Sequence, residues 1–330
     1  MRPDASVVIC AYTAERWDHL VAAVGSVRRQ SLPPREVVVV VDNNPPLLER
    51  ARRELADVRL VHNQAPPGLS WARNAGVAAA RGELVAFVDD DAVAAPDWLD
   101  WLTAPCADRS VLGAGGAVVP LWPSRRPTWL PEEFDWVVGC SYRGLPEAPA
   151  PVRNPIGANM CLRREIFETI GGFQPGIGRI GTRPVGCEET ELCIRARQRW
   201  PERRFLYEPR ARVLHHVAEQ RTRWRYYRQR CFAEGVSKAI VTGLVGAQDG
   251  LACERSYVLR TLPRGVGSAL GEALLHADAA AAARACAIVA GLTITAAGYA
   301  FGALSARRLP RQRSGAAPFP AAAASIETRP

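Results

Sequence analysis

The chain has 330 residues, 48% of them hydrophobic, which is enough to build one large domain with or without an appendage and excludes a wholly disordered protein. Its formal net charge is +9, carried almost entirely by arginine, and this favours anionic ligands or a membrane surface as partners. No zinc-finger, basic-zipper or RNP-like pattern is present, so nucleic acid is not expected as a partner.

The cysteines indicate a reducing compartment. They are scattered without a CxxC pair, and several lie in apolar segments, among them Cys10, Cys161 and Cys193. Such cysteines are typical of reduced core thiols in a cytosolic protein. The N-terminus leads almost at once into an expected strand and shows no charged-then-apolar leader, so no secretory signal is expected. The sequence therefore predicts a cytoplasmic protein.

The first part of the chain alternates between apolar runs and segments of helical spacing. The expected strands are 6–10, 37–41, 58–62 and 83–88. The expected helices carry the apolar positions of 17–27, 47–55 and 70–80. Because the strands are Val-rich runs without polar alternation, both faces of their sheet should be covered. The pattern predicts an α/β fold with a doubly wound, mostly parallel, Rossmann-like sheet.

Polar clusters follow three of these strands, at Ala11-Tyr12, at Asp42-Asn43-Asn44 and at Asp89-Asp90-Asp91. Ligands of parallel sheets bind beyond the carboxyl ends of the strands, so the clusters are expected to line one crevice. Adjacent carboxylates are unfavourable without a compensating cation, and oxygen ligands suit Mg²⁺ or Mn²⁺. A solvated acidic turn is the alternative for an isolated triplet. Since GxGxxG and GxxxxGK[ST] are absent, the sequence predicts a metal-dependent nucleotide site.

Over residues 5–217 the chain contains, in this order, SVVICAY, VVVVVDNN, PPGLSWARNAG, LVAFVDDD, GANMCLRREIFETIGGF and CEETELCIRARQRW. This ordered set resembles the family 2 inverting glycosyltransferases of the GT-A fold, and it is far more specific than any one segment. The resemblance implies a GT-A domain, expected here over residues 1–220, with a nucleotide-sugar donor and Mn²⁺ or Mg²⁺ as cofactor.

The resemblance also implies how the nucleotide is bound. Asp42 would accept hydrogen bonds from a pyrimidine ring, with a helix N-cap as the alternative. Arg73, beside a helix N-terminus, would bind the diphosphate, with a surface ion pair as the alternative. Asp91 would be the direct metal ligand, and Asp89 would contact both the ribose and the metal. The remaining expected nucleotide contacts are Ala11, Tyr12, Glu15 and Asp90.

A paired carboxylate is expected to carry the chemistry. Glu188 and Glu189 stand at the start of a helix whose apolar positions are Leu192, Ala196 and Trp200. A helix N-terminus favours an ionised carboxylate, which an inverting transfer needs as its base. An ordinary acidic first turn is the alternative. The family's common pattern here is Gly-Glu-Asp, so Glu189 takes the position of the catalytic Asp with one extra methylene, and Glu188 is the second candidate.

Further site residues come from the second half of the GT-A region. By resemblance, His215 completes the metal sphere or contacts the diphosphate, although His216 is adjacent and a structural role is also open. Gly157 and Asn159 are expected in a strand beneath the reacting centre, with Gly157 permitting close approach of the donor sugar. The Pro- and Trp-rich segment 121–142 is expected to be a loop over the site, where Trp129 would stack on a sugar or instead fill the core.

The chain changes character in its last third, expected as a helical, membrane-associated extension over 221–309 and a disordered tail over 310–330. RTRWRYYRQR at 221–230 suits an anionic interface or a solvated basic helix. Residues 285–304 contain no charge and are long enough to span a membrane, yet arginines follow them. An interfacial or re-entrant helix fits these arginines better than one crossing, and a buried docking helix is also open. The Gly-rich segment 171–186 is expected to be mobile.

Together these features predict a metal-dependent inverting glycosyltransferase at the cytoplasmic membrane surface. It would move a sugar from a nucleotide diphosphate donor, preferably a UDP-sugar, to a hydroxyl of a lipid-linked or polysaccharide acceptor. A sugar-nucleotide nucleotidyltransferase is the rival enzyme, but AYTAERW does not resemble the Gly- and basic-rich loop of that class. A catalytically silent GT-A module that binds nucleotide or glycan is the non-enzymatic rival.

Overall fold

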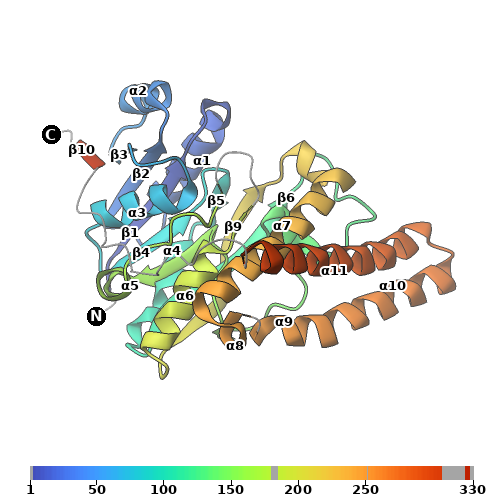
Figure 1. Cartoon of the computed structure of the whole chain (residues 1–330). Coiled ribbons are helices and arrows are strands. Elements are labelled where there is room, and N and C mark those ends of the chain that lie inside the picture. The colour runs from blue at the N-terminus through green and yellow to red at the C-terminus, as the bar shows by residue number, and fades with distance from the viewer. Residues whose placement is uncertain (1–2, 180–184, 251, 307–323, 328–330) are drawn as a thin grey trace.

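A computed structural model describes residues 3–179, 185–250, 252–306 and 324–327 (Figure 1). Its centre is one sheet with the strand order β10-β3-β2-β1-β4-β8-β6-β9-β5, and β7 pairs with β9 outside this path. The strands are β1 (Ala5–Ala11), β2 (Glu36–Asp42), β3 (Arg59–Asn63), β4 (Leu84–Val88), β5 (Ala92–Ala94), β6 (Val111–Leu121), β7 (Ala150–Val152), β8 (Asn159–Arg163), β9 (Arg204–His216) and β10 (Ala324–Glu327).

The helices divide between the two faces of this sheet and a C-terminal group. Those of the first part are α1 (Trp17–Arg28), α2 (Pro45–Glu54), α3 (Leu69–Ala79), α4 (Trp98–Thr103), α5 (Arg164–Ile170) and α6 (Glu188–Arg199), with the 3-10 helices η1 (Ala14–Arg16), η2 (Ala104–Ala107) and η3 (Glu132–Val138). The C-terminal group is η4 (Glu219–Thr222), α7 (Trp224–Val245), α8 (Ala247–Gly250), α9 (Ala252–Ser256), the π-helix η5 (Tyr257–Thr261), α10 (Leu262–His276) and α11 (Ala279–Ala306).

The predicted doubly wound sheet is confirmed. β1 pairs in parallel with β2 and β4, and β2 with β3, so the Val-rich runs form the buried centre. One face of the sheet packs on α1, α2 and α4, and the other on α3, α5 and α6, which explains why alternate residues such as Val39 and Val40 are both buried. Beyond β4 the sheet becomes mixed, because β8 runs antiparallel to β4 and β6.

The C-terminal helices form the predicted helical extension. α11 lies between α7 and α10, and α10 and α11 form a hairpin that projects from the body (Figure 1). A Cβ on Gly235 of α7 would collide with the backbone oxygen of Thr295 in α11, so glycine at this position allows the two helices to touch. Residues 279–305 are apolar and long enough to span a membrane, with 28% of the most apolar window buried. α11 packs on α7 and α10 while most of its apolar window is not buried, so the alternatives for 285–304 stay predictions.

Two boundaries were expected from the sequence alone. The boundary after residue 220 falls within η4, just before α7. Of the tail 310–330, the structure describes only 324–327, which pairs antiparallel with β3 and so differs from the expected disorder in these four residues. The rest of that tail, and residues 180–184 of the segment expected to be mobile, lie outside the described residues.

Candidate functional site

The acidic triplet meets His215 at the end of β4. β5 follows the triplet and pairs antiparallel with β9, with Ala92 opposite His215. This register places the His215 Nε2 atom 3.2 Å from an Asp91 carboxylate oxygen. Ligand atoms of Asp89, Asp91 and His215 all lie within 4.8 Å of one another. Two carboxylates and one imidazole at this spacing fit a divalent cation such as Mn²⁺.

The second histidine lies elsewhere. The ring of His216 stacks on that of His19, with centroids 4.3 Å apart. His215 instead has its Nδ1 atom 3.9 Å from the Cys140 thiol, which leaves Nε2 directed at Asp91. The geometry thus brings His215, and not His216, to the carboxylates. A contact on the second ring nitrogen is a common way to orient a ligating histidine.

Arginines compensate the triplet from one side. Arg16 Nη1 lies 3.0 Å from both Asp90 and Asp91, and Arg221 lies 3.9 Å from Asp91. Burial acts to raise the pKa of Asp91, but His215, Arg16 and Arg221 outweigh it and hold that pKa well below its usual value. Burial and the charge of Asp91 raise the pKa of Asp90 to about 7. One buried Asp90 oxygen lacks a hydrogen-bond partner within the described residues, as expected beside a cation site.

The residues expected to contact the nucleotide lie at the ends of β1 and β2. Asp42 accepts a hydrogen bond from the Asn63 side chain at 2.6 Å and one from the Gly68 N–H at 2.9 Å. The alternative role for Asp42 as a helix N-cap is wrong, because Asn44 caps α2 by accepting from the Leu47 N–H. Asp42 lines the cavity together with Ala11 and Tyr12.

Arg73 links the triplet to the paired glutamates. Its guanidinium lies 2.6 Å from a Glu188 oxygen and 3.6 Å from Asp89, and it donates to the Gly157 carbonyl at 3.0 Å. A Cβ on Gly157 would lie 2.8 Å from that guanidinium, so glycine makes room for Arg73. Arg73 is buried, and the alternative of a surface ion pair is therefore wrong. Gly157 lies in the turn before β8 and not in the expected strand. The expected role of Arg73 at the diphosphate stays a prediction, since its guanidinium contacts Glu188 and this turn.

Glu189 faces the cavity from the first turn of α6. Cys187, which precedes the helix, has a left-handed φ of 72°, a conformation that glycine adopts without strain. Burial, followed by the charge of Glu188, raises the pKa of Glu189 to about 8. Glu188 is instead buried against Arg73. Of the pair, Glu188 is thus held by an ion pair and Glu189, within the described part of the chain, is not, and the role of Glu189 as the base stays a prediction.

Three expected site residues lie elsewhere in the structure. Glu15 is exposed on η1 and does not line the cavity; the next residue, Arg16, does. Asn159 is fully buried, where its amide donates to the Ala117 and Ala211 carbonyls and accepts from the Trp98 indole, so it is a core residue. Trp129 packs edge-on against Trp224 and Tyr227 and does not line the cavity. This is the core-filling alternative for Trp129.

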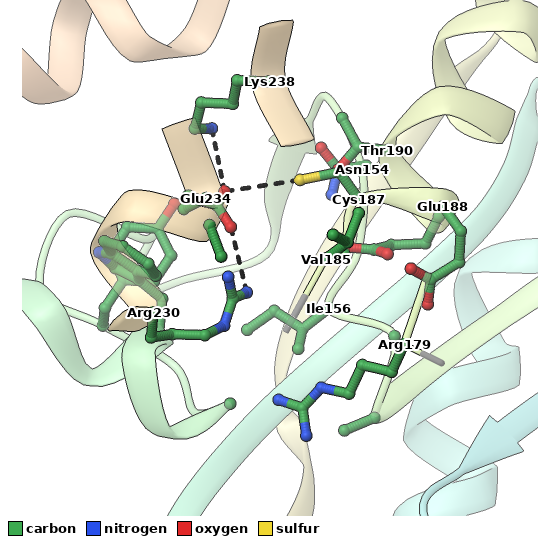
Figure 2. Close-up of a pocket in the computed structure, with 18 of the residues that line it drawn as sticks. Asn154, Ile156, Arg179, Val185, Cys187, Glu188, Thr190, Arg230, Glu234 and Lys238 are labelled. Carbon is green, nitrogen blue, oxygen red and sulfur yellow. Dashed lines mark hydrogen bonds and ion pairs between the residues drawn. The ribbon is translucent and has the colours of Figure 1, made fainter. Parts of the chain in front are cut away.

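The cavity over these residues has a volume of about 2620 Å³ and is also lined by residues of the C-terminal helices. Figure 2 shows the contribution of α7, whose Arg230, Glu234 and Lys238 face the turn at Cys187. Functional candidates that the sequence did not single out are therefore Arg16, Arg179, Arg221, Arg230, Glu234 and Lys238. The basic and aromatic segment 221–230 is the signal that could have identified Arg221 and Arg230.

A sheet of this topology with acidic side chains at its carboxyl edge defines a GT-A-type glycosyltransferase. A sequence model of glycosyl transferase family 2 matches residues 6–171. The chain is 37% identical over 240 residues to a glucosyl-dolichyl phosphate glucuronosyltransferase from Haloferax volcanii, covering 72% of this chain and 76% of that one. It is 27% identical over 198 residues to a probable N-acetylgalactosaminyltransferase 9 from Caenorhabditis elegans, covering 52% of this chain but only 33% of the relative. The chain belongs to glycosyl transferase family 2.

Solved structures share the fold. GalNAc-T7 with UDP, GalNAc and Mn²⁺ superposes with a TM-score of 0.51 at 20% identity, over 71% of this chain and 48% of that one. The mannosyltransferase PcManGT from Pyrobaculum calidifontis, in complex with GDP-Man and Mn²⁺, gives a TM-score of 0.57 at 17% identity, over 91% and 88%. The predictions of a GT-A fold and of a glycosyltransferase are confirmed. The nucleotidyltransferase and the silent module are therefore set aside.

Proposed function

We propose that this glycosyltransferase moves a sugar from a nucleotide diphosphate donor, preferably a UDP-sugar, to a hydroxyl of a lipid-linked acceptor, with inversion at the anomeric carbon. The observation that carries this proposal is that Arg73 joins Glu188, the neighbour of Glu189, to Asp89 within one cavity. A donor bound at the acidic triplet and an acceptor bound at Glu189 would then lie next to each other in this cavity.

In this proposal the chain's own residues move the proton. Glu189 takes the proton of the acceptor hydroxyl as that oxygen bonds to the anomeric carbon and the bond from this carbon to the diphosphate breaks. Arg16 and Arg221, which contact Asp91, face the departing diphosphate and stabilise its charge. Because displacement is direct, an α-linked donor gives a β-linked product.

The proposed cofactor is Mn²⁺ or Mg²⁺, held by Asp89, Asp91 and His215. Their ligand atoms lie close enough to share one ion, and the two solved structures that the fold resembles contain Mn²⁺. When bound, the cation would neutralise part of the diphosphate charge. Asp42, Ala11 and Tyr12 line the cavity beyond this edge and are the proposed contacts for base and ribose.

A lipid-linked acceptor is favoured over a polysaccharide by the far wall of the cavity. This wall is apolar and comes from η5, α10 and α11, with Val258, Leu262, Leu292 and Tyr299 among its residues. The Haloferax volcanii relative, whose name refers to glucosyl-dolichyl phosphate, supports the same choice. Such a wall would hold part of a polyprenyl chain, which a polysaccharide lacks.

The exposed side of α10 is the proposed contact with the membrane. Leu274 and Leu275 are 85% and 81% exposed, and Leu259 in η5 is 68% exposed. Arg260 and Arg264, which follow Leu259 in the chain, are also exposed. A helix with exposed leucines and flanking arginines is typical of an interfacial helix on anionic lipid. The proposed location is the cytoplasmic surface of the membrane, where a cytosolic nucleotide sugar can reach the site.

A panel of nucleotide sugars tests this function. With Mn²⁺ and a mixed polyprenyl phosphate-sugar acceptor, one UDP-sugar should release UDP and label the lipid, and a chelator should stop both. If only a GDP-sugar released its nucleotide, the donor would be a GDP-sugar and not a UDP-sugar. Absence of release from every donor, with or without acceptor, would refute the proposed function.

A further inference from the structure

Two arginines line the cavity, Arg230 on α7 and Arg179 on the segment that precedes α6. Arg230 projects from α7, where it pairs with Glu234 at 3.1 Å and lies 5.8 Å from the centre of the Trp136 ring. Arg179 enters from the segment after Gly178, and Figure 2 shows its side chain on the other side of Ile156 from Arg230. Within the described residues, no carboxylate lies at ion-pair distance from the Arg179 guanidinium.

The electrostatics of this wall favour an anion. Burial and the positive charges of Arg221 and Arg230 lower the pKa of Arg179, and the opposing effects of Tyr226 and Asp89 offset this only in part. Arg179 therefore lies in the positive field of two other guanidinium groups that line the same cavity. Binding of a phosphate would relieve this repulsion, and a planar guanidinium suits phosphate oxygens.

Arg230 lies beside the turn that carries the base. The Gly186 N–H donates to Ser237 on α7 at 3.1 Å, and the Cys187 thiol contacts Glu234 at 3.5 Å. A Cβ on Gly186 would lie 3.5 Å from an Arg230 nitrogen. The donor edge lies on the other side of the base, where Arg73 joins Glu188 to Asp89. Along the cavity wall the order is therefore donor carboxylates, base and then Arg230.

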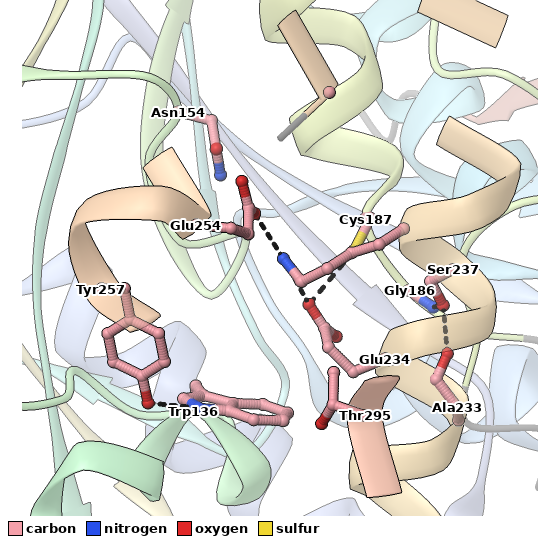
Figure 3. Close-up of polar contacts among 12 residues, drawn as sticks. Trp136, Asn154, Gly186, Cys187, Ala233, Glu234, Ser237, Glu254, Tyr257 and Thr295 are labelled. Carbon is pink, nitrogen blue, oxygen red and sulfur yellow. Dashed lines mark hydrogen bonds and ion pairs between the residues drawn. The ribbon is translucent and has the colours of Figure 1, made fainter. Parts of the chain in front are cut away.

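An aromatic and apolar surface continues from this point. The Trp136 indole N–H donates to the Tyr257 hydroxyl at 3.2 Å, and Figure 3 shows this pair beside Glu234 and Thr295. Beyond it lie the apolar residues of α10 and α11 that line the same cavity. A ligand in contact with Arg230 thus meets an aromatic face suited to a sugar ring and then a surface suited to a hydrocarbon chain.

We propose that Arg230 and Arg179 bind the phosphate of the acceptor, which is a sugar joined through that phosphate to a lipid. This inference rests on the proposed function and names its acceptor class. Trp136 lies under the acceptor sugar, whose hydroxyl points to Glu189, and the lipid follows η5, α10 and α11. The alternative source of the anion is the donor diphosphate, which has its own contacts at the metal edge.

Direct binding separates these sources. The probes are farnesyl phosphate, farnesol and UDP with Mn²⁺, and the readout is the dissociation constant for the full-length protein. Arg179→Gln and Arg230→Gln should each raise the dissociation constant of farnesyl phosphate at least 10-fold. They should change the dissociation constant of UDP by less than twofold. Arg53→Gln, an exposed arginine on α2 outside the cavity, is the matched control and should change neither.

Each other result overturns the inference. Equal affinity of the wild-type chain for farnesol and farnesyl phosphate would show that no phosphate site exists. If the same variants weakened the binding of UDP to the same extent, the two arginines would bind the donor diphosphate and not the acceptor phosphate. If Arg230→Gln fails to fold because Glu234 keeps only Lys238 as a cationic partner, Arg179→Gln decides alone, since no carboxylate of the described residues pairs with Arg179. A failure of the proposed function is distinguishable, because it would abolish nucleotide release from every donor while leaving these constants measurable.

Discussion

Asp90 and Asp91 are neighbours in the sequence, yet their surroundings shift their acidities in opposite directions. Both are buried, but only Asp91 is reached by His215 and Arg221 in addition to Arg16. The pKa of Asp91 is lowered and that of Asp90 is raised to about 7. Identical residues in the sequence therefore differ in acidity, because the neighbouring cationic side chains favour the ionised form of Asp91 more than that of Asp90.

We expect Asp91→Asn to reduce transfer by about 100-fold or more and to abolish saturable Mn²⁺ binding, because the amide cannot supply the anionic ligand. Calorimetric titration with Mn²⁺ and initial rates at saturating donor would measure both effects. Asp18→Asn, an exposed aspartate on α1, is the matched control. Full transfer activity of Asp91→Asn in the presence of a chelator would remove this residue from the metal site.

Glu189→Gln should lower kcat by roughly 100-fold or more while donor affinity is nearly kept, since only proton removal is lost. Glu188→Gln should behave differently and lose stability, because it breaks the buried 2.6 Å contact with Arg73. Steady-state kinetics and thermal melts of both variants separate the roles. The opposite pattern, with Glu188→Gln folded normally but inactive, would exchange the two assignments.

The raised pKa of Glu189 predicts two pH dependences of opposite sign. The base must be ionised, so the wild-type rate should rise as the pH rises through about 8. The carboxyl of Glu189 has a pKa of about 8 in the folded protein and of 4.5 in the unfolded chain, so the folded protein binds the proton more tightly. The resulting contribution to stability is fully present below pH 4.5 and is lost as the pH rises to about 8. Glu189→Gln should therefore raise Tm relative to wild type at pH 9 but not at pH 4. An equal Tm difference at both pH values would contradict the shift.

The residues that the sequence predicts well are those fixed by local order. The triplet follows a strand, and a strand end needs no distant contact to be recognised. The sequence placed three residues wrongly, Asn159, Trp129 and Glu15. The position of each side chain depends on tertiary contacts, which the local sequence does not determine. Asn159 satisfies two backbone carbonyls from β6 and β9, and a sequence with no pairing information cannot reveal this.

At the scale of elements, the first four strands were predictable because each is a continuous buried run. Pairing in the second half was not, since β9 is long and contacts β5, β6 and β7 at once. The register of β5 with β9 is what selects His215 over His216. A shift of one residue would turn the other ring toward the triplet, because neighbouring side chains of a strand point to opposite faces.

The contact between α6 and α7 is an element-scale feature with a testable effect. Ser237 accepts from the Gly186 N–H and donates to the Ala233 carbonyl at 2.8 Å, as Figure 3 shows. Ser237→Ala should leave that N–H unpaired, lower stability by about 1 kcal/mol and reduce kcat more than donor affinity, because the base-bearing turn loosens. Thr293→Ala on α11, which removes a similar hydroxyl from an exposed position, is the control. Equal kcat values for the two variants would mean that α7 does not position the base.

At the scale of the whole molecule, α7 to α11 line the cavity and also place the α10–α11 hairpin away from the sheet (Figure 1). The apolar run 285–304 was recognisable in the sequence, but its partner was not. Small residues such as Gly235 and Gly298 allow α7 and α11 to approach closely, so a run suited to a membrane span also suits a docked helix. Which one applies depends on tertiary packing that composition does not encode.

The exposed leucines of the hairpin give the last prediction. Leu274→Glu should weaken binding to vesicles containing anionic lipid at least 10-fold, because it places a charge where an 85% exposed leucine would enter the lipid interface. High salt should weaken wild-type binding only in part, since it screens Arg260 and Arg264 but not the leucines. Val21→Glu adds the same charge at an exposed valine of α1 and is the matched control. Vesicle cosedimentation measures each case; unchanged binding of Leu274→Glu, or equal loss for Val21→Glu, would place the membrane contact elsewhere on the molecule.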